Sequence, residues 1–338
     1  MNNKDNFFQF LRGLSILVVV LIHSFSINLN KDPGNASFQV IIRQLINFPV
    51  PLFFFISGYF VKLDELNNTR AFLAKKLLKI IPPYLVWSLI GIIYAGDFSI
   101  RSMVIKLATG TAFGQLYFIV ALIQLILLTP FMGKTLNNKK IRIMIFLITP
   151  IYLAVIYTCS FITKQFVPFD HYALPFTNWI VFYYYGLFVR NPGPAWQSYQ
   201  SKRTFYLIGY MVTLILSIGE GILLNNGNFF VFAVSQIKIS SFLASFFLIS
   251  LLLARKNDIR PSSNHVLVRL GDYSFGIFLS HYFFLLLLTR TNILGSVTSQ
   301  PEYVLLMGAM VVCASFGFCF LGRKILGTSL AGRWLGFV

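Results

Sequence analysis

The chain has 338 residues, of which 57% are apolar, 17% aromatic and only 11% charged. A typical soluble domain carries about 25% charged residues, so this composition excludes soluble globular and disordered proteins. There are 28 Lys and Arg residues against 10 Asp and Glu, a formal net charge of +18. The charges form short clusters between long apolar blocks. This pattern favours the basic cytoplasmic loops of a membrane protein over a nucleic-acid-binding surface.

Ten apolar blocks of about membrane-spanning length follow one another along the chain. They cover about residues 12–29, 44–62, 80–96, 114–132, 142–162, 173–190, 204–223, 229–254, 272–289 and 303–323. When the blocks alternate from a cytoplasmic N-terminus, 21 of the 28 basic residues lie inside and 7 outside. We therefore predict an all-α polytopic integral membrane protein with about ten transmembrane helices and both termini cytoplasmic. Residues 1–338 form a single transmembrane domain in this prediction, with no fused soluble domain.

The first block carries two ionisable residues, Arg12 and His23, which are 11 positions apart. At 100° per residue this spacing is about 20° past three full turns, so both side chains lie on one face about 16 Å apart. A guanidinium at the inner membrane surface can hold a phosphate, and an imidazole deeper in the membrane can take a proton from a hydroxyl. The alternative is that Arg12 anchors the helix at the cytoplasmic surface and His23 bonds a neighbouring helix.

A basic pair precedes the third block. Lys76 and Lys79 are three residues apart, so they line one face of a helix, and Pro82-Pro83 is expected to break or kink the chain just after them. Two aligned lysines at a membrane surface can bind a phosphorylated ligand, or they can attract lipid headgroups. In the second block, Ser57 and Gly58 are small enough to let another helix approach closely.

Further polar residues lie at or inside later blocks. Gln115 and Tyr117 open the fourth block, Glu220 lies at the outer end of the seventh, and His281 lies inside the ninth. Glu220 can simply be solvated and His281 can be a buried hydrogen bonder, and whether either shares a cavity with His23 is left open. The four histidines are scattered, and the three cysteines have no ligand spacing. We therefore expect no metal site and expect the cysteines to be small buried residues.

Taken together, the motifs resemble those of the membrane acyltransferase-3 family, whose members O-acetylate bacterial surface glycans. The resemblance covers nearly the whole chain and rests on four motifs in order: Arg12-x10-His23, Phe53-Phe54-Phe55-Ile56-Ser57-Gly58-Tyr59, Lys76-x-x-Lys79 before Pro82-Pro83-Tyr84, and Leu270-Gly271-Asp272-Tyr273-Ser274-Phe275-Gly276-Ile277-Phe278-Leu279-Ser280-His281. The chain departs from the family pattern at Gln115 and Tyr117, where many relatives have histidine and tryptophan. It also has lysines where the basic pair is usually two arginines. It resembles the stand-alone members, without a fused extracytoplasmic domain.

The resemblance implies acetyl-CoA as a cytoplasmic co-substrate and no permanently bound cofactor. It implies, as acceptor, a sugar hydroxyl on an O-antigen, an exopolysaccharide or an undecaprenyl-linked saccharide at the outer face of the bacterial inner membrane, among membrane lipids and without nucleic acid. His23 and Arg12 are then expected to be catalytic, with Arg12, Lys76, Lys79 and Ser57 on the donor. The remaining candidates, for the cavity or the acceptor, are Glu220, His281, Tyr117 and Gln115.

Three alternatives stay open. His23 can deprotonate the acceptor directly, or it can carry the acyl group as a transient acyl-histidine. The group can be succinyl rather than acetyl. From a different class, a transporter or flippase of a lipid-linked saccharide also fits ten helices with buried ionisable residues, although no inverted repeat with paired broken helices is visible. Transfer requires His23 and consumes acyl-CoA, whereas flipping requires neither.

Overall fold

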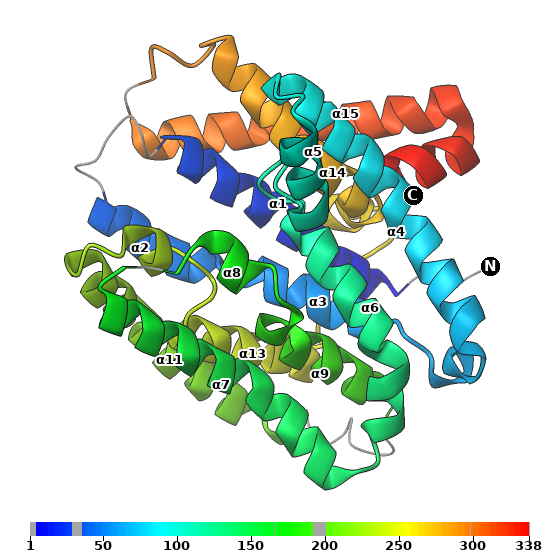
Figure 1. Ribbon diagram of the computed structural model, residues 1–338, viewed down its shortest axis with the longest axis vertical. Helices are drawn as coiled ribbons and strands as arrows, with labels where there is room; N and C mark the ends of the chain where they lie inside the picture. The colour runs from blue at the N-terminus through cyan, green and yellow to red at the C-terminus, as the bar shows by residue number, and fades with distance from the viewer. Residues whose placement is uncertain (1–4, 29–35, 166, 192–200, 298, 338) are drawn as a thin grey trace. The chain divides into compact units, whose positions relative to one another are not determined.

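The computed structural model describes residues 5–28, 36–165, 167–191, 201–297 and 299–337, and within these ranges every regular element is a helix (Figure 1). Lys4 and Lys31, which the topology prediction counted inside and outside, lie beyond the described residues, as does residue 29 of the first block. The chain forms two compact units. Unit 1 comprises Met1–Asp32, Ala74–Val120 and Pro261–Val338, and unit 2 comprises Pro33–Leu73 and Ala121–Arg260.

The prediction of an all-α polytopic membrane protein is confirmed. Among the described residues, eight helical stretches are long and apolar enough to cross a membrane: Asn6–Ile27, Phe38–Tyr59, Leu63–Ala95, Tyr117–Thr135, Lys139–Thr163, Arg203–Asn226, Val266–Arg290 and Gln300–Leu335. The sixth and eighth apolar blocks form shorter helices, Ile180–Arg190 and Ile239–Ala254. Their main helices begin only at Ile180 and Ile239, and in the eighth block the interruption coincides with a polar first half.

Unit 1 is built around three helices that come from opposite ends of the chain: α1 (Asn6–Asn28), α14 (Val266–Arg290) and α15 (Gln300–Leu330). A Cβ added to Gly13 of α1 would overlap the carbonyl oxygen of Leu267, and one added to Gly271 of α14 would overlap that of Gln9. Only glycine permits such an approach of one backbone to another. Further along, His23 of α1 lies beside His281 of α14, so the two helices run in the same direction.

Of the break or kink expected at Pro82-Pro83, the break is wrong, because one helix, α4 (Thr69–Ala95), runs through both prolines. Two prolines remove two backbone hydrogen bonds, so the second half of the helix needs other support. The Tyr84 hydroxyl donates to the Leu107 carbonyl at 2.6 Å, and Trp87 Nε1 donates to the Leu335 carbonyl at 3.3 Å. These tertiary bonds favour a continuous helix.

A short helix, α5 (Ile100–Thr109), follows α4 in a segment that lies between the third and fourth apolar blocks. Ser99 caps it by accepting from the Ser102 amide at 3.3 Å. Hydrogen bonds from Ser102, and then from Lys106 at 3.2 Å, hold the pKa of the exposed Asp97 carboxyl well below its usual value. At its other end Gly110 adopts φ 68°, the left-handed conformation that glycine tolerates best, and turns the chain toward α6 (Tyr117–Thr135).

The C-terminal segment of the described chain folds back onto unit 1. Gly327 interrupts α15 with φ 75° and ψ 158°, and a π-helical turn, Ala331–Leu335, follows. Phe337 then packs fully buried, with its ring 5.4 Å from that of Phe318. This segment therefore belongs to the core of unit 1.

Unit 2 contains the middle of the chain. Its elements are α2 (Ala36–Ile46), α3 (Pro49–Tyr59), η3 (Leu63–Asn68), most of α6, α7 (Lys139–Thr163), α8 (Phe169–Ala173), η4 (Phe176–Asn178), α9 (Ile180–Arg190), α11 (Arg203–Asn226), α12 (Phe230–Ala233) and α13 (Ile239–Ala254). Helices α3 and α9 cross as closely as α1 and α14 do, because Gly58 faces the Tyr183 carbonyl and Gly186 faces that of Phe55. The small residue in the second apolar block therefore serves packing, as predicted.

The cysteines correct one expectation. Cys319 is buried, but Cys159 of α7 and Cys313 of α15 lie on exposed helix surfaces. In an apolar block the sequence does not distinguish a core position from a lipid-facing one, because both are equally apolar.

Candidate active site

The central feature of unit 1 is a pair of histidines on adjacent helices. The ring centroids of His23 on α1 and His281 on α14 are 5.3 Å apart, with 43° between the ring planes. His23 is half-buried, whereas His281 is completely buried. The structure thus brings together two candidates that are separated by most of the sequence.

The ring of Tyr282 packs against one side of His23. The Tyr282 ring stands edge-on to His23, with centroids 5.2 Å apart and an interplanar angle of 87°. Gly114 packs against the Tyr282 ring, since a Cβ on this glycine would lie 3.5 Å from the ring, and the Phe113 ring is 6.1 Å away. The imidazole of His23 is therefore bordered by aromatic rings from α14, whereas part of it stays accessible.

The segment before α6 is tied to the same part of α14. Gln115 is buried and donates through Nε2 to the carbonyls of Leu279 at 3.2 Å and Phe278 at 3.4 Å. The Phe118 ring packs on Phe278 with centroids 5.2 Å apart. Tyr117, between them, is buried. These contacts give Gln115 the structural task of fixing α14 just before His281.

Arg12 lies on α1 in the same uninterrupted helix as His23, so the shared face predicted from their spacing applies. Its side chain is half-buried, and Nη1 is 3.5 Å from Gln9 Oε1. Asp272 of α14 interacts with it electrostatically. The Arg12 guanidinium therefore has a carboxylate close by and is partly exposed.

The other predicted donor residues divide between the units. Lys76 and Lys79 lie on α4 in unit 1, the first half-buried and the second exposed. Ser57 belongs to unit 2, where its hydroxyl donates to the Phe53 carbonyl one turn earlier at 2.8 Å. That bond is a local helix contact.

Glu220, also in unit 2, is half-buried and hydrogen-bonded to neighbouring helices. Its carboxylate accepts hydrogen bonds from the Tyr157 hydroxyl and from the hydroxyl and amide of Ser240. Close by in sequence, Lys238 is completely buried at the break between α12 and α13 and donates to Gln44 and to the Ala233 carbonyl. These contacts connect helices α2, α7, α11 and α13, so we interpret them as structural.

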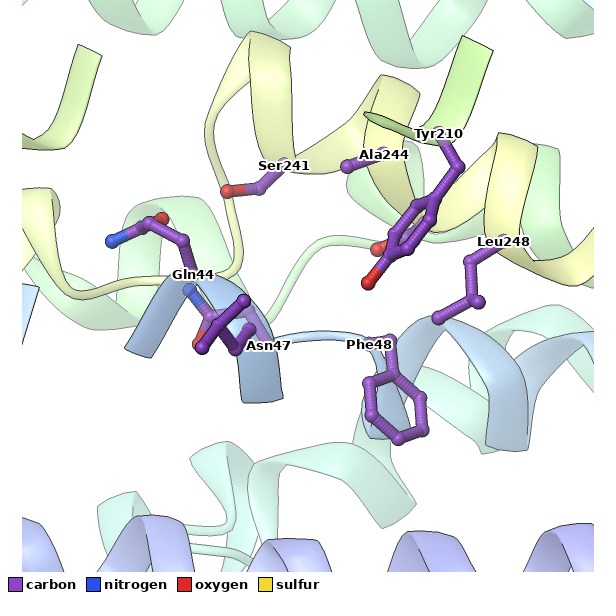
Figure 2. A pocket seen from close by; sticks show the side chains of 9 residues that line it. Gln44, Asn47, Phe48, Tyr210, Ser241, Ala244 and Leu248 are labelled. Atoms are coloured by element: carbon purple, nitrogen blue, oxygen red, sulfur yellow. The ribbon is translucent and has the colours of Figure 1, made fainter. Parts of the chain in front are cut away.

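A small pocket opens beside this cluster in unit 2. Figure 2 shows the Tyr210 hydroxyl pointing toward Asn47 and Phe48 on the opposite side of the pocket. Amides, hydroxyls and apolar groups line it, and no histidine or carboxylate does. It therefore lacks the general base that the histidine pair of unit 1 supplies.

Sequence reasoning missed two members of the site, Tyr282 and Asp272. Both lie in or beside the motif that ends at His281, and Tyr282 directly follows that histidine. A polar or aromatic residue next to a buried histidine is a signal worth testing, but which residues face His23 or Arg12 depends on how α14 packs.

A family model described as an acyltransferase domain matches residues 5–320. The chain belongs to the acyltransferase-3 family. The match includes α1, α14 and all four motifs on which the resemblance rests, so this is a membrane acyltransferase. Comparison with curated proteins and with solved structures gave no match.

Proposed function

We propose that this acyltransferase-3 protein moves an acyl group, acetyl in the first instance, from acyl-CoA to a sugar hydroxyl of a lipid-linked or surface polysaccharide. The observation that carries the proposal is His23, a half-buried imidazole in a membrane-spanning helix, bordered by His281 and Tyr282 and aligned with Arg12. Placing an ionisable residue within a membrane-spanning helix costs free energy, and such residues are retained mainly for function.

In the proposed reaction His23 takes the proton of the acceptor hydroxyl while the oxygen attacks the thioester carbonyl. The carbonyl–sulfur bond then breaks, the ester is complete, and the imidazolium returns its proton to the departing CoA thiolate. Direct transfer needs one base and no second nucleophile. It is therefore the form of the reaction that a single accessible imidazole supports best.

The donor is proposed to enter from the cytoplasmic side, with its phosphates near Arg12, Lys76 and Lys79. Arg12 is suited to a phosphate because a guanidinium offers several donors in a planar fork. The distribution of basic residues supports a cytoplasmic location for both chain termini. The inner membrane of a bacterium is proposed from the family alone, whose members act on bacterial surface glycans. The acceptor is then reached from the outer half of the membrane.

The test compares cells that make wild-type protein, His23→Ala or the matched control His171→Ala, at equal levels in the membrane. His171 is an exposed histidine of unit 2 with no proposed role. We expect O-acyl groups on the isolated surface glycans to disappear only with His23→Ala, and the mass added in wild type to distinguish acetyl from succinyl. If acylation is unchanged and a lipid-linked saccharide accumulates on the inner leaflet, a transport function replaces this one.

A further inference from the structure

The hydrogen bonding of His281 fixes which of its ring nitrogens carries the proton. Nδ1 is 3.0 Å from the carbonyl oxygen of Ile277, one turn earlier on α14. A carbonyl can only accept, so Nδ1 is the protonated nitrogen and Nε2 carries the lone pair. The side chain is fully buried, so water does not compete for either position.

The second ring nitrogen of His281, Nε2, can accept a hydrogen bond. Nε2 is buried and has no hydrogen-bond partner among the described residues. A buried polar atom left unpaired costs free energy, and in a native protein it calls for an explanation. Within unit 1, the imidazole of His23 lies beside His281 and can supply a hydrogen-bond donor.

The separation of the two rings fits a hydrogen bond between them. A linear N–H···N bond of about 3 Å, with about 1 Å from each nitrogen to its ring centre, puts two imidazole centroids roughly 5 Å apart. The centroids of His23 and His281 are 5.3 Å apart. The observed centroid distance is slightly longer than that of a hydrogen-bonded pair, and catalytic hydrogen bonds often shorten only when substrate is bound.

We propose that His281 is the positioning residue of the reaction, whose Nε2 accepts a hydrogen bond from the ring N–H of His23 and leaves the other His23 nitrogen as the base. The proposal rests on the function assigned to His23 above. Tyr282, edge-on to His23, limits how the ring can turn away from this bond. A base oriented by a second side chain follows the general arrangement of activated nucleophiles and bases in acyl transfer.

The same bond acts throughout the proton transfer. When His23 takes the acceptor proton it becomes an imidazolium, and the N–H that faces His281 becomes a stronger donor. His281 keeps its own proton on Nδ1, where it is donated to the Ile277 carbonyl, and takes no proton from His23. The proton leaves His23 toward the CoA sulfur, so the balance of the proposed reaction is unchanged.

Two substitutions of His281 distinguish the role of its Nε2 from that of its Nδ1. His281→Gln places an amide where Nε2 lies, and His281→Asn places one where Nδ1 lies. The first keeps an acceptor for His23, whereas the second keeps only the bond to Ile277. We expect kcat to fall about 100-fold or more in His281→Asn, as a misplaced catalytic group does, and to fall less than about 10-fold in His281→Gln. The KM for acyl-CoA should stay unchanged in both variants.

A spectroscopic measurement tests the bond without relying on activity. The chain has four histidines, so ¹⁵N-labelled histidine gives few ring signals, and His23→Ala identifies those of His23. We expect one tautomer of His23 in wild type and in His281→Gln, and a mixture of both in His281→Asn.

Equal kcat and one His23 tautomer in wild type and folded His281→Asn would overturn the positioning role, as would equal losses of kcat in the two His281 variants. The proposed function fails separately, if His23→Ala itself remains active.

Discussion

Gly13 of α1 and Gly271 of α14 face each other where the two helices of the site cross. A Cβ on Gly13 would lie 3.1 Å from the Gly271 amide nitrogen and would overlap the Leu267 carbonyl. His23 and His281 lie about ten residues further along the same two helices. The close crossing therefore sets the separation of the two imidazoles.

Gly13→Ala should destabilise the protein and impair transfer together, because backbone atoms cannot move aside as a flexible side chain can. Overpacking of this kind costs about 1–3 kcal/mol. Gly317→Ala is the matched control, since nothing lies within 4 Å of a Cβ at that position of α15. Thermal unfolding in detergent should show a lower Tm for Gly13→Ala only. Equal Tm values for the two variants would contradict the close crossing.

Arg12→Ala should weaken donor binding more than the chemical step. Losing one charge-assisted hydrogen bond worth about 1.5–3 kcal/mol raises the KM for acyl-CoA about 10- to 100-fold. Arg12→Lys, which keeps the charge but loses the planar fork, should lie between. Initial rates at varied acyl-CoA measure this, with Arg101→Ala on exposed α5 as control. A fall in kcat alone would assign Arg12 a different role.

Lys238→Met should destabilise unit 2. The buried ammonium donates to Gln44 Oε1 and to the carbonyls of Ala233 and Ser235, which methionine leaves without this donor. Each buried group deprived of its partner costs about 1–3 kcal/mol. Lys140→Met, at an exposed position of α7, should leave Tm unchanged. If both variants unfold at the wild-type temperature, the lysine does not hold the break between α12 and α13.

Asp97→Asn should weaken the start of α5 at neutral pH and have little effect in acid. The pKa of Asp97 is depressed by its bonds to Ser102 and Lys106, so its contribution is complete well above the usual Asp value of about 4 and is lost as the pH falls below it. Hydrogen exchange of the α5 amides, compared between the two proteins at each pH, measures this. A difference that stays constant down to pH 2 would contradict it.

The sequence predicts much of the fold because membrane helices leave a strong signal. Block boundaries predicted α1, α7 and α14 to within several residues, and the 3.6-residue period placed Arg12 and His23 on one face of α1. The break between α2 and α3 was not visible, because the residues on both sides of Asn47 are apolar. Helix α5 was missed for the opposite reason, because it is too polar to resemble a membrane span.

The site could be predicted only one helix at a time. His23 was recognisable as an intramembrane ionisable residue, and so was His281, but their contact joins residues more than 250 positions apart. Nothing in either local pattern specifies which helices pack together. Glu220 shows the same limit, because its partners Tyr157 and Ser240 lie on other helices, and it is their contacts that make it a half-buried member of a hydrogen-bonded cluster.

The position of α14 in the chain has a consequence for biosynthesis. α1 is synthesised more than 230 residues before α14, and at about 5–20 residues per second roughly ten seconds or more separate them. During this interval all of unit 2 emerges, whereas α1 has neither its glycine-lined crossing partner nor a second imidazole beside His23. A helix that carries an arginine and a histidine into lipid alone is poorly stabilised. Unit 1 is therefore completed only after the chain of unit 2 has been made, when α14 and α15 pack against α1.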